Sequence, residues 1–243
     1  MSAVAFAAKN CALESMTISG KAVSAARRYE SGDLSIDGLV DACIENDLDD
    51  DATDLIFART VLFIEHPCRQ TYDLAELSAI HRILFEQVYP DAGRLRTHDT
   101  AVNMYHVSPD DMAANSQAFF PASMLETGAA NIASELAEHR NLRCMDREDF
   151  VRSLAHFYDE LGYLHPFSKD NAMTLRIFAS RIAHAAGWDL DWGPIDADEY
   201  KTAKRLAYHG DTSGFRMLFD RIVRPANPTR VFLIAGWDQG PAH

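Results

Sequence analysis

The stretch YLHPFSKDNAMTLR, residues 163–176, decides the fold and carries the candidate chemistry. It predicts a tight loop that runs directly into a helix, because Pro166 favours a turn and the residues from Asn171 to Ile182 show helical spacing. We expect His165 to lie in the open on this loop, where its imidazole can take up a proton near neutral pH. The start of the helix offers free backbone N–H groups, which favour an anion. The stretch therefore predicts a general base beside an anion site.

The chain is acidic and rich in apolar residues. Of its 243 residues, 47% are hydrophobic, which is enough to bury a core and argues against a disordered chain. The net charge is −13 and the pI is about 5.1. Nucleic-acid backbones are bound by clusters of Lys and Arg, and no basic tract interrupts this acidic sequence. We therefore expect no nucleic-acid partner.

The cysteines and the first residues predict a reduced, cytoplasmic protein. The residues from Met1 to Ala8 lack the basic start and the long apolar segment of a secretion signal, and no apolar run approaches the ~18 residues of a membrane span. We expect no membrane partner; secretion as an effector through another kind of signal stays open. The cysteines form no Cys-x-x-Cys pair and no zinc-finger spacing, so a structural zinc is not expected. They are Cys11, Cys43, Cys68 and Cys144.

Helical periodicity dominates the rest of the chain, so the predicted fold class is mainly α. Asp73 and Asp146 precede two of the periodic segments as candidate N-caps. Thr100 to Val107 is the best extended segment and predicts a short β-hairpin, with Val231 to Ile234 as a weaker strand candidate. The helical segments are marked by Leu55, Ala58 and Leu62; by Leu74, Leu77, Ile80 and Leu84; and by Phe150, Leu154, Phe157 and Leu161.

A short acidic run, residues 47–51, is the one candidate domain boundary. We predict an N-terminal helical appendage over residues 1–50, a main domain over 51–225 and a C-terminal tail over 226–243. No internal repeat and no low-complexity tract is visible in the sequence.

The motif resembles that of the Fic family, in which a loop histidine and the helix that follows transfer part of a nucleotide to a protein hydroxyl. The resemblance rests on His165-Pro166-Phe167 with Asn171 and Arg176, and it extends over about residues 52–223. It includes Tyr72 to Phe85, then Tyr89, Ala92-Gly93 and Arg94-Leu95-Arg96, and later Gly210-Asp211 with Leu218-Phe219. It implies a helical bundle with a short β-hairpin flap ahead of the motif.

The resemblance assigns a role to each motif residue. His165 would be the base that takes the proton of the target hydroxyl; the alternative is a loop histidine that only bonds to backbone. Pro166 and Phe167 would shape and anchor the loop. Asn171 would help to hold the α-phosphate, or would simply cap the helix. Arg176 would meet the terminal phosphate, or would form a surface ion pair.

The chain also departs from the family pattern. Lys169 stands where the family places an acidic Mg²⁺ ligand, so a magnesium cofactor is in doubt and the cofactor stays unknown. Asp170 replaces a glycine at the phosphates; at ~4 Å and an effective dielectric of ~20 its repulsion of an anion is about 4 kcal/mol. Ala172 replaces a second glycine and Met173 an arginine. A rescue in which Asp170 binds the metal and Lys169 supplies positive charge would require a changed geometry.

The N-terminal segment from Ser15 to Gly20 resembles the antitoxin-like S-x-x-x-E-G motif, in which a Glu blocks the final motif arginine. Ser19 stands at the Glu position and cannot form that ion pair, so we expect the regulatory lock to be broken; the alternative is an ordinary solvated helix. In the flap, Tyr105 and His106 are candidate ligand contacts, and the flap would align a target protein by strand addition. Tyr200 either lines a base pocket or belongs to an amphipathic helix face.

Three functions remain open from sequence. The first is a diverged Fic transferase that uses His165 and either a nucleotide or another phosphate-containing donor. The second is a catalytically silent Fic fold that binds a partner protein. The third is a His165-dependent enzyme acting on a small metabolite, which a closed apolar pocket around His165 would favour over an open phosphate groove.

Overall fold

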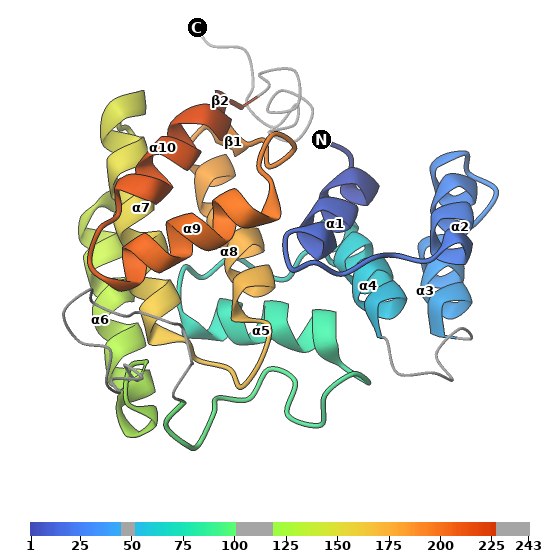
Figure 1. Cartoon of the computed structure of the whole chain (residues 1–243), viewed down its shortest axis with the longest axis horizontal. Helices are drawn as coiled ribbons and strands as arrows, with labels where there is room; N and C mark the ends of the chain where they lie inside the picture. The colour runs from blue at the N-terminus through green and yellow to red at the C-terminus, as the bar shows by residue number, and fades with distance from the viewer. Residues whose placement is uncertain (45–51, 101–118, 227–243) are drawn as a thin grey trace, which may run out of the picture.

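The computed structural model describes residues 1–44, 52–100 and 119–226, and helices dominate this part of the chain (Figure 1). Two short 3₁₀ turns, Ala122–Met124 and Arg140–Leu142, flank α6. The α-helices are α1 (Ala3–Ala12), α2 (Gly20–Glu30), α3 (Ile36–Ile44), α4 (Thr53–Glu65), α5 (Leu74–Phe85), α6 (Leu125–Glu138), α7 (Arg147–Leu164), α8 (Asn171–Ala185), α9 (Ala197–Tyr208) and α10 (Ser213–Ile222). The strands are β1 (Trp188–Leu190) and β2 (Val223–Pro225).

The prediction of a mainly α fold is confirmed, and the helical segments found by periodicity are α4, α5, α7 and α8. Asp73 caps α5 by accepting from the N–H groups of Ala75 and Glu76, and Asp146 caps α7 through Asp149. These bonds satisfy backbone donors that a helix start leaves without partners.

The two predicted strand segments stay predictions. Residues 101–107 of the expected hairpin and the whole 231–234 candidate lie outside the described residues. The described strands β1 and β2 pair antiparallel, with Trp188 opposite Pro225 and Leu190 opposite Val223. Each is three residues long and adjoins a helix, which is too short for an alternating pattern to stand out in the sequence.

Helix α8 lies among its neighbours and carries the motif into the core (Figure 1). It contacts α5, α7 and β1, while α9 and α10 pack on each other and against α7. On the other side, α1, α3 and α5 all pack against α4, which explains why α4 is buried nearly all round. Phe57 and Phe63 of α4 are fully buried, and each contributes roughly 1.5–3 kcal/mol through removal of apolar surface from water.

The predicted boundary at residues 47–51 falls outside the described residues and stays a prediction. Helix α1 nevertheless contacts both α4 and α8, and Ala7 and Cys11 of α1 have no exposed surface. The first helix therefore shares its core with the body that carries the motif.

All four cysteines lie in the described ranges, and no disulfide joins them, as the sequence predicted. Within those ranges, no helix combines the length and the apolar character that a membrane crossing requires. A cytoplasmic location stays a prediction.

The turn after α5 is joined to the motif loop through His81. The N–H of Gly93 donates to Nδ1 of His81 at 2.8 Å, so Nε2 carries the proton and donates to the carbonyl of Lys169 at 3.2 Å. Burial lowers the pKa of His81, which keeps this bridge in its neutral form. Gly93 has a φ of +76°, and a Cβ there would lie 2.6 Å from Cβ of Arg82 and 2.8 Å from the carbonyl oxygen of Ser78.

Gly93→Ala is therefore expected to destabilise the fold by about 2–4 kcal/mol, because it adds a clash with backbone to the cost of a left-handed conformation. Gly32 is a matched control: its φ is +84°, and a Cβ there meets nothing within 4 Å, so Gly32→Ala should cost only ~1–2 kcal/mol. Urea unfolding of both variants measures the difference. Equal losses would show that the close approach at Gly93 is unimportant.

Candidate active site

The motif loop is closed by its own side chains. Helix α7 ends at His165, which adopts a left-handed conformation with φ 43° and ψ 62°. Phe167 is 1% exposed and its ring stacks on His81 at a centroid distance of 4.0 Å, so its predicted anchoring role agrees with its position. The Asn171 amide accepts from the N–H of Phe167 at 2.9 Å and donates to the carbonyl of the same residue at 2.7 Å. Pro166, which precedes Phe167, is buried.

Asn171 is thus not the N-cap of α8. Asp170 occupies the N-cap position, in a left-handed conformation and without a side-chain capping bond. The side chain of Asn171 holds the loop backbone, and both ends of its amide are used.

Arg96 fixes the same loop from outside and was not singled out as a site residue from sequence. Its Nε donates to the carbonyl of His165 at 2.7 Å, and its backbone N–H donates to the carbonyl of Pro166 at 2.9 Å. Its guanidinium also donates to the carbonyls of His98 and Phe120. The guanidinium therefore joins the segments on either side of residues 101–118 to the motif. The one sequence signal was its place shortly after Gly93 in a segment that resembles the family, and nothing local indicates which distant carbonyls it binds.

His165 does not lie in the open, so that expectation is wrong. Its ring stacks on Phe119, with centroids 3.8 Å apart and planes 3° from parallel. Burial, with the nearby positive charges of Arg96 and Lys204, lowers the pKa of His165 to about 3. The imidazole is neutral over the physiological range, and a neutral ring keeps a lone pair that can accept a proton.

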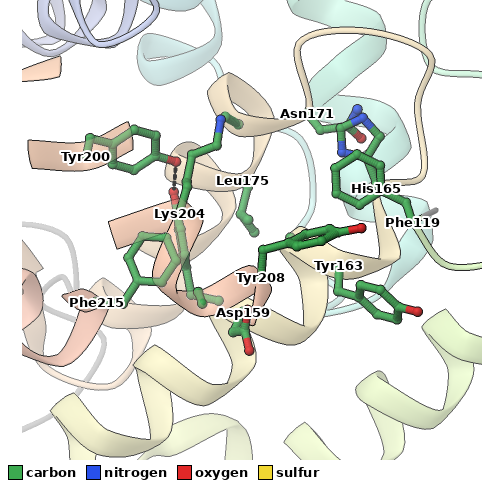
Figure 2. A pocket seen from close by; sticks show the side chains of 14 residues that line it. Phe119, Asp159, Tyr163, His165, Asn171, Leu175, Tyr200, Lys204, Tyr208 and Phe215 are labelled. Carbon is green, nitrogen blue, oxygen red and sulfur yellow. Dashed lines mark hydrogen bonds between the residues drawn. The ribbon is translucent and has the colours of Figure 1, made fainter. Parts of the chain in front are cut away.

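A pocket of about 140 Å³ opens beside this ring and is lined mainly by aromatic side chains (Figure 2). Tyr200 was expected either to line a pocket or to belong to a helix face. It lines this pocket and is also only 1% exposed, because its helix packs against the core. Sequence reasoning missed Phe119, Tyr208 and Asp159, since residues from α7, α8, α9 and α10 meet here only in the fold. The other lining residues are Tyr158, Gly162, Tyr163, Ala172, Leu175, Lys204, Ala207 and Phe215, together with His165 and Asn171.

The residues expected to meet phosphates and metal are already engaged. Asp170 accepts a hydrogen bond from the Tyr89 hydroxyl at 2.5 Å, and the Lys169 ammonium lies 5.0 Å from the centroid of the Tyr89 ring. Met173 is fully buried. Across the described ranges, no group of three or more His, Cys, Asp and Glu side chains is placed to hold a metal ion.

Arg176 forms a buried network instead of a surface ion pair. It is 1% exposed, and its Nη1 donates to Oε1 of Glu14 at 2.7 Å. Its Nε donates to Oδ1 of Asn10 at 2.6 Å, and its Nη2 donates to the Asn10 carbonyl at 3.0 Å. The ring of Tyr200 lies 4.9 Å from the guanidinium carbon. Arg176 therefore has an acidic partner in Glu14, although Ser19 does not supply one.

Ser19 lies elsewhere. It caps α2 through the N–H of Ala22, and its hydroxyl donates to Asp54 at 2.5 Å. The motif resemblance placed the inhibitory position at Ser19, whereas Glu14, earlier in the chain, is the residue that reaches Arg176. The available signal was an amide at Asn10 and a carboxylate at Glu14, close together at the end of a predicted helical segment. Tyr105 and His106 lie outside the described residues.

Comparisons with known proteins identify the family. The Fic/DOC family model matches residues 71–183. A probable protein adenylyltransferase Fic from Salmonella typhimurium is 31% identical over 156 residues, which span 64% of this chain and 72% of that protein. The chain therefore belongs to the Fic/DOC family.

Two further matches extend the comparison. Protein adenylyltransferase VbhT of Bartonella schoenbuchensis is 29% identical over 62% of this chain, but the match spans only 29% of VbhT. The BepC effector of Bartonella tribocorum, solved with bound AMPPNP, has a TM-score of 0.60 at 24% identity and covers 71% of this chain and 84% of that one. That likeness supports the fold.

The state of His165 predicts a pH dependence of stability. The unfolded chain should protonate this ring near ~6.5, but the folded chain only near about 3. On acidification the unfolded state takes up the proton first, so the stability that the neutral ring contributes above pH ~6.5 is lost as the pH falls toward 3.

We therefore expect the wild type to lose more stability than His165→Gln between pH 7 and pH 4, measured by urea unfolding at each pH. Asp159, whose pKa is raised to about 6, acts in the opposite direction but is present in both proteins, so the difference between them isolates His165. Parallel losses would indicate an exposed, normally titrating imidazole.

Proposed function

We propose that this chain is a diverged Fic-type transferase that moves a nucleotidyl, AMP-like group to a protein hydroxyl, with His165 as the general base. The observation that carries the proposal is the position of the His165 ring, which stacks on Phe119 and lines a pocket of the size and aromatic character that suit a nucleobase. The adenylyltransferase names of the relatives support the same reaction class.

The proposed step is a simple displacement. The ring nitrogen of His165 takes the proton of the target hydroxyl, the hydroxyl oxygen bonds to the α-phosphorus, and the bond from that phosphorus to the bridging oxygen breaks. Pyrophosphate then leaves from a nucleoside triphosphate. The backbone N–H groups at the start of α8 lie next in the chain and favour the charge on the phosphates.

The family's magnesium does not fit the residues present. The Lys169 ammonium cannot coordinate a cation, and the Asp170 carboxylate is bonded to Tyr89. We therefore derive no step through a metal.

Glu14 is the proposed regulatory residue. In the family resemblance, a glutamate on the final motif arginine keeps the terminal phosphate out, and the Glu14–Arg176 ion pair has the same character. Glu14 is partly exposed at 24% whereas Arg176 is buried, so the glutamate is the partner that can leave.

Glu14→Gln is expected to raise nucleotidyl transfer roughly 10–100-fold, because it removes a charge-assisted hydrogen bond worth about 1.5–3 kcal/mol while keeping the side-chain volume. Transfer is measured by intact mass of the protein itself and by labelling of bacterial lysate with α-labelled nucleoside triphosphates. Glu138→Gln, an exposed change on α6, is the matched control.

Glu14→Gln/His165→Ala should lose the gained transfer while remaining folded. If Glu14→Gln transfers nothing from any of the four common nucleoside triphosphates, with or without Mg²⁺, the transferase proposal is wrong.

The altered motif positions can be tested directly. Lys169→Asp/Asp170→Gly restores an acidic ligand and a glycine whose left-handed conformation needs no side chain. In the Glu14→Gln background, it should produce a Mg²⁺-dependent rise in melting temperature with nucleoside triphosphate that exceeds the rise of the unmodified motif. Tyr89→Phe, which removes only the bond to Asp170, is the control. An unchanged response would mean that these two positions do not limit triphosphate binding.

A catalytically silent binding protein is the second candidate. It is favoured by one observation: the side chains of Asp170, Asn171 and Arg176 all form hydrogen bonds with other residues of the protein. A target protein would then bind without being modified. A small non-nucleotide substrate is the third, favoured by the apolar pocket beside His165. Transfer by Glu14→Gln with loss on removal of His165 would exclude both.

A further inference from the structure

Asp159 places a carboxylate in the wall of the aromatic pocket (Figure 2). It is half-buried, on the same helix as His165, and no hydrogen bond or ion pair joins its carboxylate to another residue in the described ranges. A polar group in an apolar pocket is costly unless it is matched, which makes a carboxylate at this place a candidate contact for a ligand.

Gly162 keeps the space beside this carboxylate open. It lies in the interior of α7, where glycine lowers helix stability relative to alanine. Packing does not require it, because a Cβ at this position would meet only Cδ2 of Leu175, at 3.9 Å. The missing side chain therefore adds room to the pocket rather than allowing a close helix contact.

The rest of the pocket wall consists of flat aromatic rings and one cation, the Lys204 ammonium. Phe119, Tyr163 and Tyr208 present rings, which suit a planar ligand. The ammonium of Lys204 lies 5.6 Å from the centroid of the Tyr200 ring, so its charge is directed to that ring. A volume of about 140 Å³ exceeds what a single ordered water needs by about tenfold, which leaves room for an aromatic group.

We propose that Asp159 determines base specificity in this pocket, and that its carboxylate accepts two adjacent N–H groups from the edge of a guanine-type base that enters beside Gly162. The inference rests on the proposed nucleotidyl transfer and names its donor class. An ionised carboxylate only accepts hydrogen bonds, and it binds best where two donors lie side by side.

Among the common bases, guanine alone offers that pair, its ring N–H next to its amino group. Adenine and cytosine place an acceptor nitrogen next to the amino group, and uracil flanks its N–H with carbonyls. Each of these would set an acceptor against the carboxylate, and a mismatch in a polar site of this kind is strongly disfavoured.

The test uses nucleosides, which carry no phosphate and so do not depend on Glu14, Lys169 or Asp170. Isothermal titration of the full chain with guanosine, adenosine, cytidine and uridine should show guanosine binding at least tenfold more tightly than the others. Asp159→Asn turns one acceptor into a donor, so it should lose the guanosine preference and gain affinity for adenosine. Asp149→Asn, the same change near the start of α7, where the side chain is 51% exposed, should leave the preference unchanged.

Two further readouts separate recognition from a structural role. Burial and the neighbouring Glu160 raise the pKa of Asp159 to about 6, while His156 opposes them. The other titratable groups of the wall are His165, Lys204, Tyr158, Tyr163, Tyr200 and Tyr208. Below that pH the protonated carboxyl both donates and accepts, so the wild type should shift toward adenosine, whereas Asp159→Asn should not. Gly162→Ala should raise the melting temperature yet weaken guanosine binding.

Several results would overturn the inference: no nucleoside binding, no preference for guanosine, or a preference that survives Asp159→Asn. An equal change in Asp149→Asn would also overturn it. The transfer assay is independent. Guanosine binding without any transfer by Glu14→Gln would support the base site and contradict the transferase proposal. Transfer from ATP with no guanosine preference would support the transferase proposal and contradict the base site.

Discussion

A guanidinium that is almost wholly buried has to be surrounded by acceptors, and in this protein the position of the first helix follows from that requirement. Arg176 points inward from α8 and is satisfied by Asn10 and Glu14 at the end of α1. An unpaired charge at this depth would cost several kcal/mol. The same guanidinium lies against the ring of Tyr200, whose hydroxyl bonds to that of Tyr158 at 2.6 Å. One charge therefore ties the N-terminus, the motif helix and the pocket wall together.

The motif loop is likewise held by hydrogen bonds from polar side chains. His81, Arg96 and Asn171 hold its backbone carbonyls and amides, so protein side chains fix the shape of the loop. Asp170 tolerates a left-handed conformation, which short polar side chains accept more readily than most, and turns its carboxylate to Tyr89. The Asp170 side chain, at a glycine position of the family pattern, is thus accommodated by a hydrogen bond to Tyr89.

The sequence predicted the features that depend on neighbouring residues better than those that depend on residues far apart in the chain. Helices α4, α5, α7 and α8 and the caps Asp73 and Asp146 follow from periodicity and from side chains within one turn, and these predictions are confirmed. The stacking of His165 on Phe119 joins residues that lie many helical turns apart in the sequence, and no local pattern contains it. The sequence did not identify Glu14 as the partner of Arg176, for another reason. A short motif was matched at Ser19, and a match of a few residues does not determine which position reaches a distant arginine. Gly162 carried a readable signal, since a glycine inside a helical pattern calls for a reason.

The distribution of charge also indicates what kind of selectivity this site retains. In the family resemblance, Asp170 stands at a glycine position and the buried Met173 at an arginine position, and from this we infer a weaker electrostatic attraction for a polyphosphate. At the other end, an aromatic pocket with one carboxylate remains beside a neutral imidazole. Binding energy for a ligand then has to come mainly from stacking and from edge contacts, which depend on the identity of a base, whereas phosphate contacts are the same for every nucleotide. Under the proposed function, a site altered in this direction gains discrimination among donors as it loses general affinity for them.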